Sequence, residues 1–251
     1  MLWEALGISG PGVIACVGAG GKTSLVQSLA VSAGRRGVAA LVTTTTRMFY
    51  SQVAGYALTL SDDYTAGSVK VAASLKQRIT AAWLTGLEGE KACGLPGAWI
   101  DRLASSLPSA YILVEADGAR RALLKAPAAH EPVVPTSTII TAGVLNLGVI
   151  GRALSPDNAH RLDLVTNIIH KRQGEIVSWL DIARLAVHPN GIFQHACGRK
   201  VLLLSGGGQA DSGVVASQIA AYCLLAGTNI ERVVVSAGYG GSMQPAAVYK
   251  L

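Results

Sequence analysis

The sequence predicts an α/β fold, a three-layer sandwich built around a mostly parallel sheet. Short apolar runs, typical of buried strands, alternate with helical stretches along the whole chain. Half of the 251 residues are hydrophobic and only 14% are charged, so the chain can bury a large core. Its 29 glycines suit tight connections between strands and helices. We expect a single domain over residues 1–251, in which about 151–198 could form a helical sub-lobe.

The first three elements form a βαβ unit. Residues 13–17 are a continuous apolar run between Gly12 and Gly18, which predicts a strand buried on both faces. Residues 22–33 carry apolar side chains at helical spacing, and Gly34 stands where a helix often ends. A second buried strand is expected at 38–42. Such a unit implies parallel strands joined by a right-handed crossover.

The rest of the chain continues the alternation. Residues 67–106 are expected to be mainly helical, with Trp83 and Trp99 on buried faces. Ser155 and Pro156 suit the start of a helix, and two helical patterns up to Val187 are interrupted near Gly174. A last helix should begin at Asp211 and reach about residue 226. The further strands are expected at 111–114, 137–141, 201–204 and 233–235.

Charge and composition limit the classes of partner. The chain holds 21 Lys and Arg against 15 Asp and Glu, a net charge of +6 that permits nucleic acid, anionic lipid or phosphate-bearing small molecules as partners. The basic residues occur in scattered pairs without interleaved aromatics, so we expect no nucleic-acid surface. No signal peptide and no run of roughly 18 apolar residues is visible, which predicts a cytoplasmic protein without a membrane span. The four cysteines lack metal-site spacing and suit reduced core positions.

The strongest chemical signal is a glycine-rich loop between the first strand and the first helix. Its glycines let successive backbone N–H groups turn toward a phosphate, and the helix start adds unpaired N–H donors. Lys22 would reach the terminal phosphates, and the Thr23 hydroxyl would hold Mg²⁺. The loop therefore predicts a P-loop-like nucleotide site, against the alternative of an ordinary glycine-rich turn. The nucleotide-binding residues would be Gly18, Ala19, Gly20, Gly21, Lys22, Thr23 and Ser24.

This loop departs from the standard motif GxxxxGK[ST]. Cys16 stands where the first glycine of that motif belongs, which leaves the shorter form GxxGK[ST]. The short form resembles the compressed loop of Mur ligases and folylpolyglutamate synthetases, which bind ATP. That likeness favours a nucleotide triphosphate as partner and suggests ATP as one candidate.

Two acids follow the strand at 111–114. Glu115 and Asp117 would end at the same sheet edge as the loop, because parallel strands share their carboxyl edge. One such carboxylate must orient the magnesium that Thr23 also touches. We expect Asp117 to hold the metal and Glu115 to act as a base or second metal contact; a capping acid at a strand end is the alternative. Lys22, Glu115 and Asp117 are thus the candidate catalytic residues.

Residues that could contact a second substrate follow two strands. Four threonines at 43–46 and Arg47 come directly after the second strand, and Thr45 and Thr46 are the favoured contacts. Beyond Asp117, a long connection carries Lys125, His130 and Glu131, which could bind an anion or metal or move protons. The glycine clusters at 206–208 and 238–241 could border the same cleft. The remaining histidines are expected to be structural or exposed: His160, His170, His188 and His195.

Four motifs together resemble the YqeC family: VGAGGKTS at 17–24, LVTTTTRMF at 41–49, VEADGARRALLKAPAAHEPVVP at 114–135 and ALSPDNAHR at 153–161. The resemblance covers the chain from its start to about residue 165. It implies a P-loop nucleotide-binding accessory protein for the maturation of selenium-dependent molybdenum hydroxylases. It also supports the site residues given above.

We therefore expect a protein that binds Mg²⁺ and ATP or GTP, hydrolyses the nucleotide or transfers its phosphoryl group, and meets a cofactor intermediate or client hydroxylase. The Asn-Lys-x-Asp signature that reads guanine is missing after residues 201–204, so ATP is at least as well supported as GTP. Two other readings stay open. One is an ATP-dependent ligase or kinase acting on a small anionic substrate, and the other is a non-hydrolysing, nucleotide-gated binding module.

Overall fold

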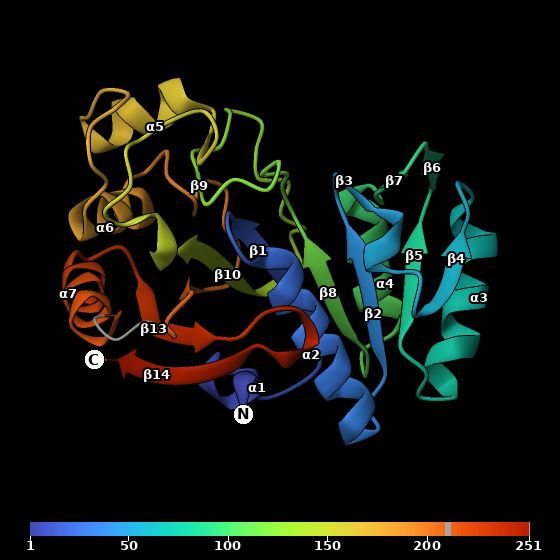
Figure 1. Cartoon of the computed structure of the whole chain (residues 1–251). Coiled ribbons are helices and arrows are strands. Elements are labelled where there is room, and N and C mark those ends of the chain that lie inside the picture. The colour runs from blue at the N-terminus through green and yellow to red at the C-terminus, as the bar shows by residue number, and fades with distance from the viewer. Residues whose placement is uncertain (209–211, 251) are drawn as a thin grey trace.

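The computed structural model describes residues 1–208 and 212–250. Its centre is a nine-stranded sheet in the order β14-β13-β12-β10-β1-β8-β2-β5-β4 (Figure 1). All neighbouring strands run parallel except the edge strand β14, which is antiparallel to β13. In chain order, the strands are β1 (Gly12–Gly18), β2 (Ala40–Thr44), β4 (Ala57–Leu60), β5 (Ala81–Leu84), β8 (Tyr111–Glu115), β10 (Thr138–Asn146), β12 (Arg199–Ser205), β13 (Ile230–Ala237) and β14 (Gln244–Lys250).

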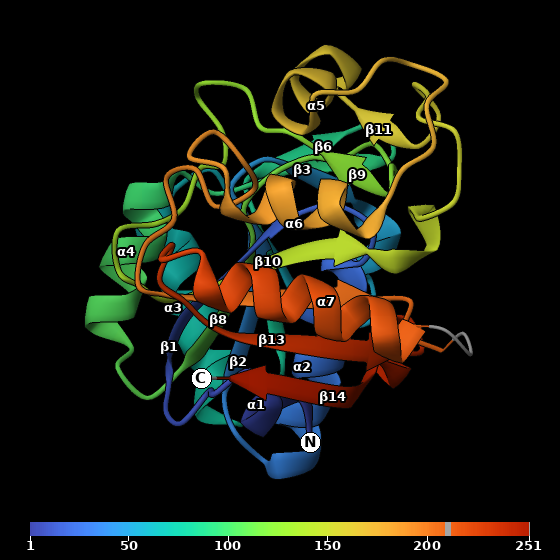
Figure 2. The ribbon, with the colours of Figure 1, turned by 90° about the vertical axis from the view of Figure 1, so that its left-hand side faces the viewer.

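Helices cover both faces of this sheet (Figure 2). One face packs against α1 (Leu2–Ala5) and α2 (Lys22–Arg36), and the other packs against α3 (Tyr64–Lys76), α4 (Gly97–Ser106), α6 (Trp179–Val187) and α7 (Ser212–Leu225). Alternate residues of β1 enter the two cores, with Ala15 on one side and Cys16 on the other. The predicted three-layer α/β architecture is confirmed.

Two small sheets stand above the carboxyl edge of the main sheet (Figure 1). The first is antiparallel and contains β3 (Arg47–Phe49), β7 (Lys91–Cys93) and β6 (Gly86–Glu88). The second pairs β9 (Leu124–Lys125) with β11 (Ala159–His160) in parallel. Beside β11, α5 (Leu162–Ile169) packs against α6. Short 3-10 turns complete the chain: η1 (Tyr50–Gln52), η2 (Leu147–Val149) and η3 (Gly240–Ser242).

The predicted βαβ unit is present, with one difference at the end of its helix. Helix α2 continues past Gly34 to Arg36, and Gly37 ends it in the left-handed conformation with φ 62°. A C-terminal glycine is favoured there because it lacks a β-carbon. Gly34 stays helical, so glycine composition alone placed the helix end about one turn too early.

Three other expectations were wrong in detail. Residues 67–106 are not mainly helical, because β5, β6 and β7 lie between α3 and α4. Trp83 belongs to β5, an apolar run of four residues that is too short to show a helical or a strand period. The predicted helix start at Ser155 is a turn, and α5 begins at Leu162. The stretch 151–198 contains a short strand, β11, besides two helices that are separated around Gly174 as expected. Asp211, the expected start of α7, lies outside the described residues.

No helix within residues 1–208 and 212–250 is both long and apolar enough to cross a membrane.

Candidate functional site

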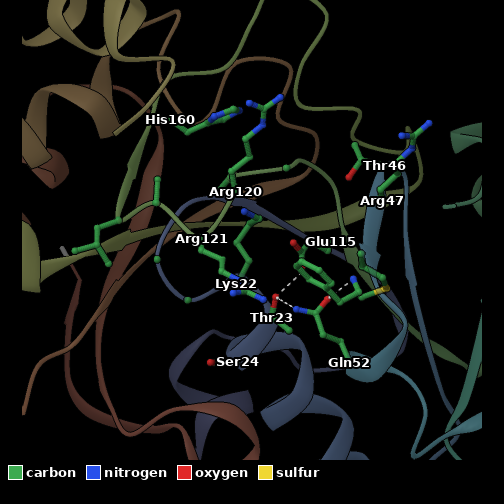
Figure 3. A pocket seen from close by; sticks show the side chains of 18 of the residues that line it. Lys22, Thr23, Ser24, Thr46, Arg47, Gln52, Glu115, Arg120, Arg121 and His160 are labelled. Carbon is green, nitrogen blue, oxygen red and sulfur yellow. Dashed lines mark hydrogen bonds between the residues drawn. The ribbon is translucent and has the colours of Figure 1, made fainter. Parts of the chain in front are cut away.

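The carboxyl ends of the central strands converge on one pocket of about 710 Å³. Strand β8 lies between β1 and β2, and its last residue, Glu115, is in register with Cys16 on one side and Thr44 on the other. The loop after β1 forms the floor of the pocket, and the connection after β8 forms one wall (Figure 3). Parallel α/β proteins characteristically bind ligands at this edge of the sheet.

The glycine-rich loop takes a shape that requires glycine. Gly18 and Gly20 have φ of 94° and 75°. A β-carbon on Gly18 would lie 2.3 Å from the carbonyl oxygen of Val144 in β10, and one on Gly20 would lie 2.5 Å from the β-carbon of Asn146. Side chains at either position would therefore push the loop off the strand beneath it.

Neighbouring strands hold this loop in place. The Ala19 amide donates to the Val144 carbonyl at 2.8 Å. The Gly20 carbonyl accepts hydrogen bonds from the side-chain amide of Asn146 at 2.9 Å and from the hydroxyl of Ser205 at 2.6 Å. The loop is thus anchored on the side away from the pocket.

On its pocket side the loop leaves backbone donors open. Residues 20–24 line the pocket, and their amides donate no hydrogen bond to any described part of the chain. Helix α2 begins at Lys22, so its first turn points unpaired N–H groups and the positive end of its dipole at the same space. This arrangement can bind an anion of the size of a phosphate.

Lys22 is buried at the base of the loop. Its ammonium donates to the Gly18 carbonyl at 2.6 Å and lies 3.1 Å from Oδ1 of Asp117. Burial opposes the charge on Lys22, but the negative charges of Asp117 and Glu115 outweigh it and raise the pKa of the ammonium. Lys22 is therefore a permanent cation whose present partner is an internal acid.

Asp117 is a buried junction between the loop and the connection after β8. Its Oδ2 accepts a hydrogen bond from the Gly18 amide at 3.0 Å and lies 2.9 Å from the ammonium of Lys125. The side chain is only 1% exposed and is not among the residues that line the pocket. Asp117 thus faces Lys22, as expected, but does so from beneath the pocket.

The chain of charges continues to the far wall. Lys125, fully buried, contacts Glu131 Oε2 at 2.8 Å, and Arg161 donates to both oxygens of Glu131 at 2.6 and 2.9 Å. Partial burial opposes the charge of Glu131, yet Arg161 and Lys125 outweigh it and lower the pKa of Glu131 to about 2. Five alternating charges therefore link the loop to Arg161: Lys22, Asp117, Lys125, Glu131 and Arg161.

Glu115, by contrast, lies beside Thr23 inside the pocket. The Thr23 hydroxyl donates to Glu115 Oε2 at 2.9 Å, and the Gln52 amide donates to the same hydroxyl at 3.3 Å (Figure 3). Burial raises the pKa of Glu115, against the opposing effect of Lys22. A hydroxyl and a carboxylate oxygen side by side are hard donors that fit Mg²⁺. Among the described residues, no group of three or more His, Cys, Asp or Glu is placed to hold a metal ion.

The four threonines do not all follow β2, because the strand runs to Thr44, and their side chains have different environments. Thr43 and Thr44 are buried and donate to the carbonyls of Trp83 and Glu115 at 2.7 and 2.6 Å. Thr45 turns away and donates to the carbonyl of Val133 at 2.8 Å. Thr46 and Arg47 line the pocket, where Arg47 pairs with Glu88 at 2.9 Å.

Only one of the other predicted substrate contacts lines the pocket. Glu131 lines the pocket, whereas Lys125 lies beneath it and His130 is exposed and outside its lining. The glycines at 206–208 and 238–241 do not line it either. Gly207 instead donates to the carbonyl of Ser236, which joins the ends of β12 and β13.

Several lining residues were not among the site residues predicted from the sequence. They come from the small sheets and the loops beside them, and they are Phe49, Gln52, Lys91, Arg120, Arg121, His160 and Arg161. His160, expected to be structural or exposed, reaches the pocket because β11 pairs with β9. Its one signal was the segment ALSPDNAHR, in which His160 and Arg161 are the last two residues.

Comparison with known proteins identifies the relatives of this chain. The family model described as YqeC protein matches residues 14–163, more than half of the chain. The chain belongs to the YqeC family. The uncharacterized protein YqeC of Escherichia coli strain K12 is 31% identical over 213 residues, which cover 83% of this chain and 81% of the relative. No solved structure matches this YqeC-family chain significantly.

Proposed function

We propose that this YqeC-family protein binds a magnesium complex of ATP or GTP at loop 18–24 and hydrolyses it or transfers its phosphoryl group, as an accessory protein in the maturation of a selenium-dependent molybdenum hydroxylase. The observation that carries the nucleotide site is the set of open amides at residues 20–24, which share one pocket with Thr23 and Glu115. The maturation role rests on the family resemblance alone.

A triphosphate suits this loop on electrostatic grounds. The open amides and the dipole of α2 supply partial positive charge. Lys22 adds a full positive charge at the base of the loop, where its ammonium donates to the Gly18 carbonyl. To reach a β- or γ-phosphate, Lys22 would exchange Asp117 for the ligand. Asp117 would still pair with the Lys125 ammonium at 2.9 Å, so this exchange would not leave a buried carboxylate without a cation.

Magnesium would bind on the other side of the phosphates. Mg²⁺ in nucleotide sites usually takes one or two protein oxygens and completes its shell with water and phosphate oxygens. The Thr23 hydroxyl and the Glu115 carboxylate are suitably placed metal ligands. The hydrogen bond that the Gly18 amide donates to Asp117 gives Asp117 a role in positioning the loop. When bound, the ion would neutralise charge that develops on the transferred phosphoryl oxygens.

Lys22→Ala tests the nucleotide site. We expect the variant to bind ATP or GTP at least tenfold more weakly, about 1.4 kcal/mol, because it loses the one full charge at the loop. Isothermal calorimetry with ATP, GTP and CTP, with and without Mg²⁺, measures this and the base preference. Lys70→Ala, an exposed lysine of α3, is the matched control. Equal affinity of wild type and Lys22→Ala would rule out this loop as the phosphate site.

Turnover separates the three forms of the proposal. A hydrolase releases phosphate from nucleotide alone, faster in wild type than in Lys22→Ala. A gated binding module binds nucleotide but turns over no faster than that variant. A ligase or kinase forms a stoichiometric product only with a second substrate. One observation favours this last form, namely the extension of the pocket past the loop to a wall of cations at Arg120 and Arg121.

A further inference from the structure

The pocket wall opposite the glycine-rich loop is strongly positive. Two acids, Glu115 and Glu131, line the pocket together with six lysines and arginines. Those six are Lys22, Arg47, Lys91, Arg120, Arg121 and Arg161. We call Arg120, Arg121, His160 and Arg161 the arginine wall. Figure 3 shows the Arg120 side chain extending beside the His160 ring, across the pocket from Thr23 and Glu115.

The charges on this wall are only partly neutralised. Arg161 is paired with Glu131, but Arg120 and Arg121 form no ion pair with any acid in the described part of the chain. Arg121 lies over the ring of Phe49 with its guanidinium carbon 4.8 Å from the ring centre. Both guanidinium groups therefore keep hydrogen-bond donors for a ligand in the pocket.

His160 lies beside the cations of this wall. It is partly buried, and burial together with the charges of Arg161, Lys125 and Arg120 lowers its pKa to about 4, although Glu131 acts in the opposite direction. Burial is the largest cause of this shift, and the three cations add to it in the direction that favours an anion at the wall. At neutral pH the ring is uncharged, so it can both donate and accept a hydrogen bond.

The backbone holds both arginines in an uncommon conformation. Arg120 and Arg121 have φ of 47° and 65°, a left-handed pair that costs free energy for residues other than glycine. The turn is closed by a hydrogen bond from the Ala122 amide to the Ala119 carbonyl at 2.9 Å, and Leu123 and Leu124 donate to Asn158 beside β11. The segments around residues 119–124 and Asn158, far apart in sequence, thus hold each other in place, and both arginines line the pocket.

We propose that the arginine wall binds an oxyanion, a carboxylate or phosphate, of a second small-molecule substrate in the pocket that also takes the nucleotide. Guanidinium groups bind both kinds of oxyanion through two parallel hydrogen bonds. The pocket volume of about 710 Å³ is within the range of small-molecule sites. The position of this anion relative to a terminal phosphate rests on the proposed nucleotide site, whereas the anion site itself does not.

The His160 ring provides a local measurement. In wild-type protein, with and without saturating Mg-ADP, NMR follows the ring during pH titration while inorganic phosphate or acetate is added. An anion against the wall offsets the charges of Arg120 and Arg161, so we expect the pKa of His160 to rise by about one unit. His160→Gln assigns the signal among the five histidines. Response to phosphate, to acetate or to both distinguishes the two oxyanions.

Arg120→Ala tests the wall directly. The variant should bind the responding probe at least fivefold more weakly and keep its affinity for Mg-ADP within about twofold. Arg152→Ala, an exposed arginine that lies outside the pocket lining, should change neither affinity. If Mg-ADP fails to bind while His160 still responds to the probes, the nucleotide proposal fails and the anion site stands.

Two results would overturn the anion site. One is a wild-type His160 titration that neither phosphate nor acetate shifts at tens of millimolar. The other is an Arg120→Ala variant that loses Mg-ADP affinity as strongly as probe affinity, because the wall would then belong to the nucleotide.

Discussion

At the scale of single residues, the two acids after β8 occupy different environments. Glu115 is the last residue of the strand and touches Thr23 in the pocket, whereas Asp117 lies beneath the loop between two lysines. The sequence could not separate the roles of the two acids, because both stand at the end of the same strand, and our prediction favoured Asp117 for the metal. The structure places Glu115 within hydrogen-bond distance of Thr23, and on that geometry we assign the metal contact to Glu115 as a proposal.

Substitution of each acid should separate these roles. Asp117→Asn leaves Lys22 and Lys125 buried with one negative charge fewer, so the free energy of unfolding should fall by about 3 kcal/mol. Glu115→Gln should keep its free energy of unfolding within about 1 kcal/mol of the wild-type value but lose the Mg²⁺ dependence of nucleotide affinity. Urea unfolding at pH 7 and calorimetry with and without Mg²⁺ measure both effects. The opposite outcome, with Asp117→Asn stable and insensitive to magnesium, would return the metal to Asp117.

Glu131 makes the stability of the protein depend on pH. Its pKa of about 2 in the folded state is below its ordinary value of 4.5, so its ion pairs stabilise the fold fully above about pH 4.5 and progressively less toward pH 2. Glu131→Gln should therefore be less stable than wild type at pH 7, and the difference should narrow as the pH falls from 4.5 to 3. Urea midpoints at pH 7, 4.5 and 3 test this. A difference that stays constant with pH would mean that the carboxylate charge contributes nothing.

At the scale of elements, α3 approaches β5 through a glycine. A β-carbon on Gly67 would lie 2.0 Å from Cζ2 of Trp83, a buried side chain in β5. Gly67→Ala should therefore destabilise the protein by about 1–3 kcal/mol, although alanine is the better helix former. Thermal unfolding measures the change. Gly213→Ala in α7, where the added carbon meets nothing within 4 Å, is the control and should be neutral or slightly stabilising.

Elements with a long period or a clear boundary could be predicted from the sequence, and the others could not. The βαβ unit with loop 18–24 and strand β8 with its two acids was recognised because apolar runs and glycines mark both. Strand β5 was missed, since four apolar residues fit a helix equally well. The contact of Asp117 with Lys125 and the arrival of His160 at the pocket depend on β9 and β11, two-residue strands that pair across 35 residues and leave no local pattern.

At the scale of the whole molecule, the candidate nucleotide site lies at the edge of one continuous nine-stranded sheet that packs against helices on both faces. The loop after β1 rests on β10 and β12 through Val144, Asn146 and Ser205, and Asp117 ties it to the connection after β8. The two small sheets stand over the carboxyl ends of the central strands (Figure 1), and residues of β3, β7 and β11 line the pocket. A ligand in the loop would therefore contact groups that are held by the central strands on both sides of β1.

The location of bound nucleotide tests the central claim most directly. Crystals of the chain grown with Mg²⁺ and a non-hydrolysable ATP or GTP analogue should show the β- and γ-phosphates against the amides of residues 20–24. Lys22 should have turned from Asp117 toward them, with Mg²⁺ between Thr23, Glu115 and the phosphates. A nucleotide bound elsewhere on the protein, or an empty loop at saturating concentration with Lys22 still on Asp117, would contradict the proposed site.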